Sequence, residues 1–221
     1  MTEPILLETA TAEQPVPPMT FVVPEGFHAL PVGIPDEERA AAMAEFVRGV
    51  YPGGDDVLWQ SAAPFYGLIA EAMAAAGLAY SAFGLFSLDS GGVAHCALSV
   101  AAYVTDHPAP DIAAQGILAI LSSDATNDAR WLDLPCGPSV VNITVREISL
   151  NPEVTASGER TTLHTGQIQV HVPFPSGRHT AVFTLDTAAI DYWGEFCNMV
   201  TAVLQTVSFP EATEPIGNTP P

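Results

Sequence analysis

The chain has 221 residues, of which 48% are hydrophobic and 14% charged, and its formal net charge is −19. This length and apolar content exclude a wholly disordered protein, and three cysteines are too few for a disulfide-built fold. No uninterrupted apolar run reaches the ~18 residues that a membrane-spanning helix needs. Six arginines and no lysine exclude nucleic acid as a partner, because phosphate binding needs a basic surface.

The two ends of the chain differ in composition from its middle. Residues 1–20 and 210–221 are rich in proline, acidic and free of basic residues, which is typical of extended, flexible tails. The N-terminal segment lacks the positive start and the long apolar run of a secretory signal, so we expect a cytoplasmic protein. Residues 21–209 are expected to form a single domain.

Apolar residues recur at helical spacing in four segments. Residues 36–51 begin with acidic residues, which suit a helix N-terminus. In the second segment Ser61 is the expected cap, Pro64 lies in the first turn and Gly77 ends the helix. Further helices are predicted over residues 111–121 and at the C-terminal end of the domain. The expected buried faces are Phe65, Leu68, Ile69, Ala72, Met73 and Ala76 in the second helix, Ile112, Ile117, Leu118 and Leu121 in the third, and Ile190, Trp193, Cys197, Val200, Val203, Leu204 and Val207 in the last.

Strand patterns occupy most of the remaining domain. Asp89-Ser90-Gly91-Gly92 between two apolar runs predicts a hairpin, and a change of apolar phase near Arg146 predicts a β-bulge. Short turns between consecutive strands and helices in separate blocks favour an α+β fold. We expect a largely antiparallel twisted sheet with packed helices, in an α/β/α sandwich-like arrangement. The expected strands are residues 27–31, 78–88, 93–104, 131–134, 139–150, 161–173 and 179–185.

The C-terminal half carries a further pattern, over about residues 130–209. It consists of Leu134-Pro135-Cys136-Gly137-Pro138, a strand that ends at Val172-Pro173-Phe174-Pro175, a strand Ala181-Val182-Phe183-Thr184-Leu185, and a helix that ends at Thr206-Val207-Ser208-Phe209. This region resembles the PsbP-like α/β/α sandwich superfamily, which includes LpqN-type actinobacterial lipoproteins. The resemblance implies a non-enzymatic binding or assembly factor. The chain departs from the exported members in having no lipid-attachment cysteine and in its longer helical N-terminal half.

Polar residues line one face of neighbouring predicted strands. Such a face binds ligands through hydrogen bonds, but an ordinary solvent-facing side of an antiparallel sheet has the same pattern. The candidate binding residues are Asn142, Thr144, Arg146, Gln167, Gln169 and His171, with Thr165, Thr180 and Thr184 beside them.

No motif in the sequence points to catalysis, a cofactor or a metal. The phosphate-binding loops, the dinucleotide fingerprint and Gly-x-Ser-x-Gly are all missing, and Asp55-Asp56 predicts a solvated loop. His164 and His171 are seven residues apart, so a regular strand points them to opposite faces. Cys136 is the cysteine expected to be accessible, while Cys96 and Cys197 fit buried positions; Cys136 beside a histidine from another strand is the open catalytic alternative.

These features favour a non-catalytic protein-binding module, such as an adaptor, a chaperone-like factor or an immunity-type protein, with an acidic surface suited to a basic partner. The alternative is a small-ligand-binding protein or an enzyme with a pocket between sheet and helices. The apolar triplet Ile5-Leu6-Leu7 is a second candidate docking motif, for another protein or a second copy of the chain, unless the N-terminal segment is a passive extension.

Overall fold

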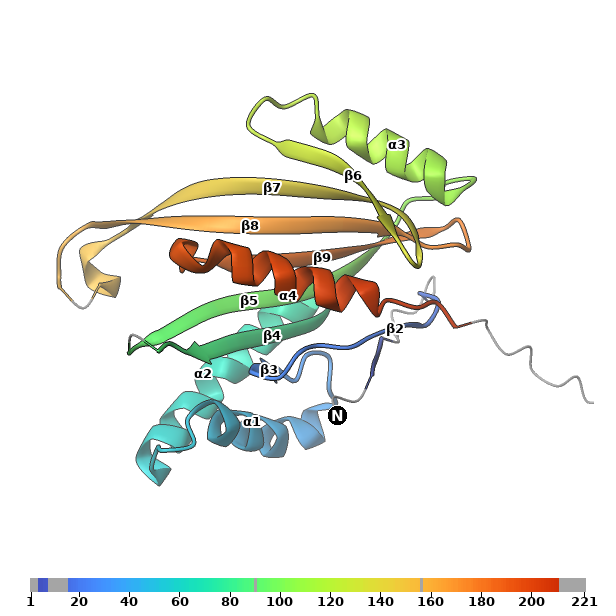
Figure 1. Ribbon diagram of the computed structural model, residues 1–221. Coiled ribbons are helices and arrows are strands. Elements are labelled where there is room, and N and C mark those ends of the chain that lie inside the picture. Colours follow the sequence, from blue (N-terminus) through green and yellow to red (C-terminus); the bar gives the residue numbers. More distant parts are fainter. Residues whose placement is uncertain (1–3, 8–15, 90, 156, 211–221) are drawn as a thin grey trace, which may run out of the picture.

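The computed structural model describes residues 4–7, 16–89, 91–155 and 157–210 (Figure 1). Residues 211–221 and much of the predicted N-terminal tail (1–3 and 8–15) lie outside the described residues. The elements are β1 (Ile5–Leu7), β2 (Met19–Phe21), β3 (Phe27–Ala29), α1 (Asp36–Val50), α2 (Asp56–Ala75), β4 (Leu78–Ser87), β5 (Val93–Val104), α3 (Pro110–Leu121), β6 (Asp128–Leu134), β7 (Gly137–Leu150), η1 (Pro152–Val154), β8 (Thr161–Pro173), β9 (His179–Thr187), η2 (Ile190–Tyr192) and α4 (Trp193–Gln205).

A seven-stranded sheet forms the centre of the fold, in the order β3-β4-β5-β9-β8-β7-β6. Every neighbouring pair in it is antiparallel. Strands β5 and β9 are neighbours although they are distant in the sequence, and their register places Val100 opposite Phe183. This pairing joins the N-terminal half of the sheet to the C-terminal half. The α+β fold with an antiparallel sheet is therefore confirmed.

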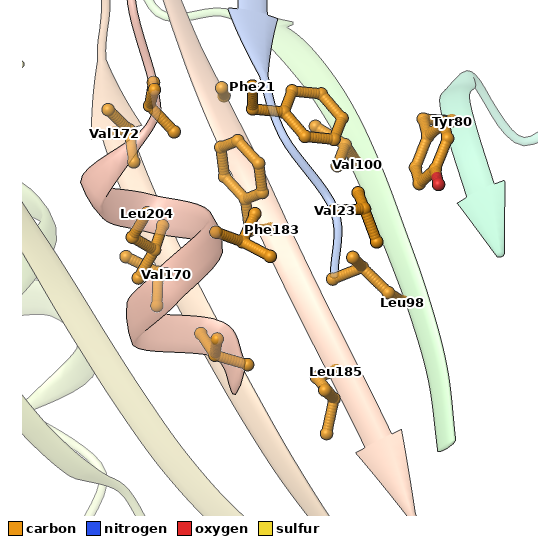
Figure 2. Close-up of a cluster of buried hydrophobic side chains, with 14 of the residues drawn as sticks. Phe21, Val23, Tyr80, Leu98, Val100, Val170, Val172, Phe183, Leu185 and Leu204 are labelled. Carbon is orange, nitrogen blue, oxygen red and sulfur yellow. The ribbon is translucent and has the colours of Figure 1, made fainter. Parts of the chain in front are cut away.

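The main core lies between one face of the sheet and α4, which crosses in front of it in Figure 1. Alternate residues of the central strands point toward this core, including Leu98 and Val100 of β5 and Phe183 of β9 (Figure 2). Helix α4 adds Phe196, Val200, Val203 and Leu204, all buried. Phe196 was not among the expected core residues, whereas Cys197 is only partly buried, because α4 faces the sheet through a slightly rotated stripe. Ile190, which is 38% exposed, lies in η2, before α4 begins.

The N-terminal segment completes this core. Strand β1 pairs with β2, Leu7 is buried, and Ile5 packs against the cluster, so only Leu6 of the triplet is exposed. Phe21 of β2 meets Tyr80 and Phe183 in edge-to-face contacts, with ring centroids 5.3 Å apart in each pair. These contacts correct the expectation that residues 1–20 form a tail separate from the domain: among the described ones, residues 5–7 and 16–20 belong to the fold. They also leave Ile5 and Leu7 unavailable as docking residues.

The opposite face of the sheet is covered at its two ends and open in the middle. Helices α1 and α2 cover the β3–β4 end, where Phe83 of β4 packs against Phe46 and Tyr66. Helix α3 contacts β6, β7 and β8 at the other end. Strands β5 and β9 lie between these two covers. The sheet therefore has helices on both faces, with a gap on the second.

Helix α2 differs most from its prediction. It begins at Asp56, where the Asp55 carboxylate accepts a hydrogen bond from the backbone N–H of Leu58, and Pro64 lies in its interior. Part of the expected buried face is turned outward, since Phe65 is 61% and Leu68 66% exposed, while Ile69 and Met73 of that face do pack against the cluster between α1 and α2. Small residues of α2, among them Gly67 and Ala70, are the fully buried ones, because they let the two helices approach closely.

Two smaller expectations are also corrected. The β7–β8 register runs without a shift through Arg146↔Thr165 and Ile148↔Leu163, so there is no bulge near Arg146. The apolar phase changes because this end of the hairpin extends beyond the helices, which leaves Val145 69% and Ile148 43% exposed. In α3, Ile112 is exposed, and the buried residue is Ala114.

Candidate functional site

The predicted polar residues come together on the open face of the sheet. Register pairs place Asn142 opposite Gln169 and Gln169 opposite Thr184, while Thr144 lies opposite Gln167. In each of these strands the alternate residues face the main core, so the polar side chains all point to the face that carries α1, α2 and α3. We call this surface the polar strip. It comprises Asn142, Thr144, Arg146, Thr165, Gln167, Gln169, His171, Thr180 and Thr184, together with Ser99 and Asp186.

A chain of hydrogen bonds crosses the strip from β7 to β9. Arg146 donates from Nη2 to Oε1 of Gln167 at 2.9 Å, and Gln167 donates from Nε2 to Oδ1 of Asp186 at 2.8 Å. The Gln167 amide thus separates a guanidinium from a carboxylate. Gln167 is only 8% exposed, so this arrangement is held rigidly on the sheet.

Two polar groups beneath α3 have unused hydrogen-bonding capacity. Asn142, 6% exposed, donates from Nδ2 to Oδ1 of Asn127, and Asn127 in turn donates to the Leu121 carbonyl at the end of α3. Within the described residues, Oδ1 of Asn142 and Oγ1 of Thr144 have no hydrogen-bond partner. Unpaired buried polar atoms cost free energy, and neither Asn142 nor Thr144 lines one of the two cavities at the strip.

A cavity of about 310 Å³ lies where the strip meets α3. Its polar lining is uncharged: Ser99, Thr105, Gln169, His171, Thr180 and Thr184, beside Tyr103 and the apolar Ile117 of α3. His171 is hydrogen-bonded to Gln169 at 3.1 Å, and burial lowers the pKa of its imidazole below the ordinary value. The ring is therefore neutral at pH 7, and the cavity offers neutral donors and acceptors.

A second cavity, of about 390 Å³, lies at the other end of the strip, under α1 and α2. Tyr51, Tyr66 and Phe83 contribute aromatic walls, and Thr165 and Asp186 of the strip contribute polar groups. The two tyrosine hydroxyls share a hydrogen bond of 2.8 Å. Burial, reinforced by this bond, raises the pKa of Tyr66 to about 12, so both the hydrogen bond and the neutral phenol persist at pH 7.

A third cavity, of about 500 Å³, lies between α1 and α2 and does not involve the strip. Its charges balance: Arg39 pairs with Glu71 at 2.7 Å, and Arg48 lies over the Trp59 ring, 5.5 Å from its centroid, with Asp56 also in the lining. The balance leaves no charge that selects a ligand.

Several residues of the two strip cavities were missed from the sequence. Ser99 occupies an outward position of β5, but only the β5–β9 pairing brings it beside Thr184. Tyr51 directly follows α1 and Tyr66 lies in α2, and the sequence does not show where these two helices pack on the sheet. Asp186 lies two residues after Thr184, on the same face of the strand as Thr180 and Thr184. This alternation of polar residues is the sequence pattern that could have identified it.

The structure supplies no activated nucleophile among the described residues. Burial raises the pKa of Cys96 to about 12 and raises the pKa of both Cys136 and Cys197, which keeps all three as thiols. No Ser, Thr or Cys side chain in the described part of the chain hydrogen-bonds to a histidine ring. No three His, Cys, Asp or Glu side chains within the described ranges lie together as metal ligands would.

Comparison with known proteins finds no similarity that identifies a relative. No protein family model, no curated protein and no solved structure matches the chain. The PsbP-like resemblance thus remains a prediction. No helix in the described part of the chain is long and apolar enough to cross a bilayer.

Proposed function

We propose that this protein is a non-catalytic binding module, and that it engages a protein partner through the polar strip. The observation that carries the proposal is the alignment of hydrogen-bonding side chains across β7, β8, β9 and β5 in the gap between two helical covers. An antiparallel sheet with one solvent-facing side has polar residues there in any case. The strip differs from such a face in two respects: cavities lie at both of its ends, and Arg146, Gln167 and Asp186 form a chain of hydrogen bonds across it.

The charge of the chain supports a basic partner. A net charge of −19 attracts cationic surfaces over a distance of about a Debye length, ~10 Å at 0.1 M salt, and so raises the association rate. Charge steers a partner without choosing the contact surface. In this proposal the strip makes the specific contacts.

The test is recovery of a partner from the native host by the purified protein and a strip variant. Replacing Gln169 and Thr184 with leucine and valine removes hydrogen bonds worth ~1 kcal/mol each, so recovery falls about tenfold or more. Thr162→Val with Gln205→Leu, at exposed positions away from the strip, is the matched control and keeps full recovery. Recovery that also weakens at ~0.5 M salt supports electrostatic steering. Equal recovery by the strip variant and the wild type rejects the proposal.

A second candidate function is binding of a small ligand, and the two cavities at the ends of the strip favour it. Their volumes, about 310 Å³ and 390 Å³, are at the lower end of those of small-molecule sites. A ligand present at ~100 times its dissociation constant stabilises the fold by about 2.7 kcal/mol. A thermal-shift screen with metabolites therefore detects it. A ligand whose effect disappears in the Gln169 and Thr184 variant favours this function over the first.

A further inference from the structure

We propose that the cavity under α1 and α2 is a recognition pocket for one cationic side chain, an arginine of the protein partner. This inference rests on the proposed function and deepens it: the strip binds the partner, and the pocket selects a basic one. The pocket is defined by Tyr51, Tyr66, Phe83, Thr165 and Asp186.

The walls of the pocket have the aromatic character that cations favour. Tyr66 lies edge-to-face with Phe83, at 5.8 Å between ring centroids, and Tyr51 is tilted against Tyr66 at 6.4 Å. The negative face of an aromatic ring attracts a cation within ~6 Å of its centroid, and more strongly when water is excluded. The Tyr51–Tyr66 hydrogen bond holds the two rings in place.

The floor of the pocket provides a negative charge. Among the described residues of its lining, Asp186 is the one carboxylate, His95 is the one basic side chain, and there is no arginine. Gln167 donates to Oδ1 of Asp186, and Oδ2 accepts no hydrogen bond from any described side chain. A half-buried carboxylate in a mostly apolar cavity is stabilised by an opposite charge, so the site prefers a cation to a neutral guest.

The neighbouring groups favour a guanidinium from outside. Arg146 is held at Oε1 of Gln167, so the protein's own guanidinium is separated from Asp186 by the Gln167 side chain. An anion is excluded by Asp186 and by the net charge of −19. A guanidinium is planar, so it can stack on a tyrosine ring while it bonds to the carboxylate, which an ammonium does less well.

The test uses N-acetyl-arginine amide as the probe and N-acetyl-citrulline amide as its uncharged isostere. Each is titrated into the full-length protein at pH 7, and amide NMR shifts are followed. We expect the arginine probe to cause saturable shifts at Tyr66, Phe83 and Asp186. The affinity for the citrulline probe should be lower by a factor of about ten or more. Equal affinity for both probes, or shifts outside the pocket only, overturns the inference, and this comparison needs no variant.

Variants then test whether the charge of Asp186 is the one that binds the arginine probe. Asp186→Asn retains an oxygen for the Gln167 hydrogen bond but loses the charge, and should weaken the arginine probe about tenfold or more. Asp111→Asn, an exposed carboxylate on α3, controls for net charge and should have no effect. An Asp186→Asn protein that is folded and binds as the wild type does, or an equal loss with Asp111→Asn, overturns the inference.

Failure of the pocket and failure of the proposed function give different results. If the arginine probe does not bind but partner recovery still depends on Gln169 and Thr184, only the pocket is rejected. If the probe binds through Asp186 but no partner depends on the strip, the proposed function is rejected and the pocket stands as a site for a small cationic ligand.

Discussion

Gly166 of β8 lies directly beneath the indole ring of Trp193, so close that a methyl group at position 166 would overlap the ring carbon Cζ3. Gly166 is buried in the sheet, and Trp193 is the first residue of α4. The contact therefore determines where α4 begins on the sheet. It also explains why a strand accepts a glycine at this point, since any side chain here would displace the helix.

The first prediction is that Gly166→Ala lowers the free energy of unfolding by about 1–3 kcal/mol, because the methyl group overpacks the Trp193 contact. Urea denaturation measures the change. Gly116→Ala in α3 is the control: nothing lies within 4 Å of the added methyl group, and alanine is the better helix former, so stability should rise by about 0.5–1 kcal/mol. A Gly166→Ala protein as stable as the wild type contradicts the packing of α4.

The second prediction concerns the N-terminal strand. Leu7→Ser should destabilise the domain by about 2 kcal/mol, because Leu7 is 8% exposed in the main core, and Leu6→Ser, at 53% exposure, should change stability by less than ~0.5 kcal/mol. Deleting residues 1–20 also removes the buried Met19 and should lower Tm further than Leu7→Ser does. Thermal unfolding of the three variants is the measurement. An unchanged Tm after the deletion would mean that β1 and β2 do not pack on the core.

The third prediction distinguishes the two possible starts of α2. Asp55→Ala should cost about 1 kcal/mol, because it removes the side-chain acceptor for the Leu58 N–H. Ser61 instead donates to the Leu58 carbonyl inside the helix, so Ser61→Ala should stay within ~0.5 kcal/mol of the wild type. Denaturant unfolding of both variants measures these changes in the free energy of unfolding. The reverse order of effects would place the helix start at Ser61.

The fourth prediction is a loss of stability in alkali. Burial raises the pKa of Cys96 and of Tyr80, each to about 12, from ordinary values of 9.0 and 10.0. Between the ordinary pKa of each group and its raised pKa, the group has lost its proton in the unfolded chain but retains it in the folded protein. The free energy of unfolding therefore falls as pH rises from about 9 to 12. Below pH 9 these two groups contribute no pH dependence, because both states are protonated.

A tyrosine variant isolates one part of this effect. Tyr80→Phe removes the buried phenol, so its stability should fall less steeply than that of the wild type above pH 10. Tyr103→Phe changes a side chain that is 51% exposed and should retain the wild-type slope. Urea unfolding at several pH values measures the slopes. Identical slopes for Tyr80→Phe and the wild type would contradict the burial of Tyr80.

The elements of this protein were largely predictable because their patterns are local. Alternation identified β8, and helical spacing identified α1, since each depends only on residues a few positions apart. The polar alternation of Gln167 and Gln169 likewise identified a shared face of β8. Asp55 was a local feature as well, but it was interpreted as part of a solvated loop rather than as a helix cap.

The candidate site required more than local pattern. The sequence by itself determined the fold class, most strand positions and the polar face of β7 to β9, because strand and helix periodicity follow from backbone geometry alone. The tertiary structure decided that β5 lies beside β9, that α2 turns Phe65 outward, and that β1 joins the core. It also brought Tyr51 and Tyr66 into one cavity with Asp186. These outcomes depend on which surfaces pack best against each other, and the free energy of that packing belongs to pairs of segments far apart in the chain, so no single segment carries it.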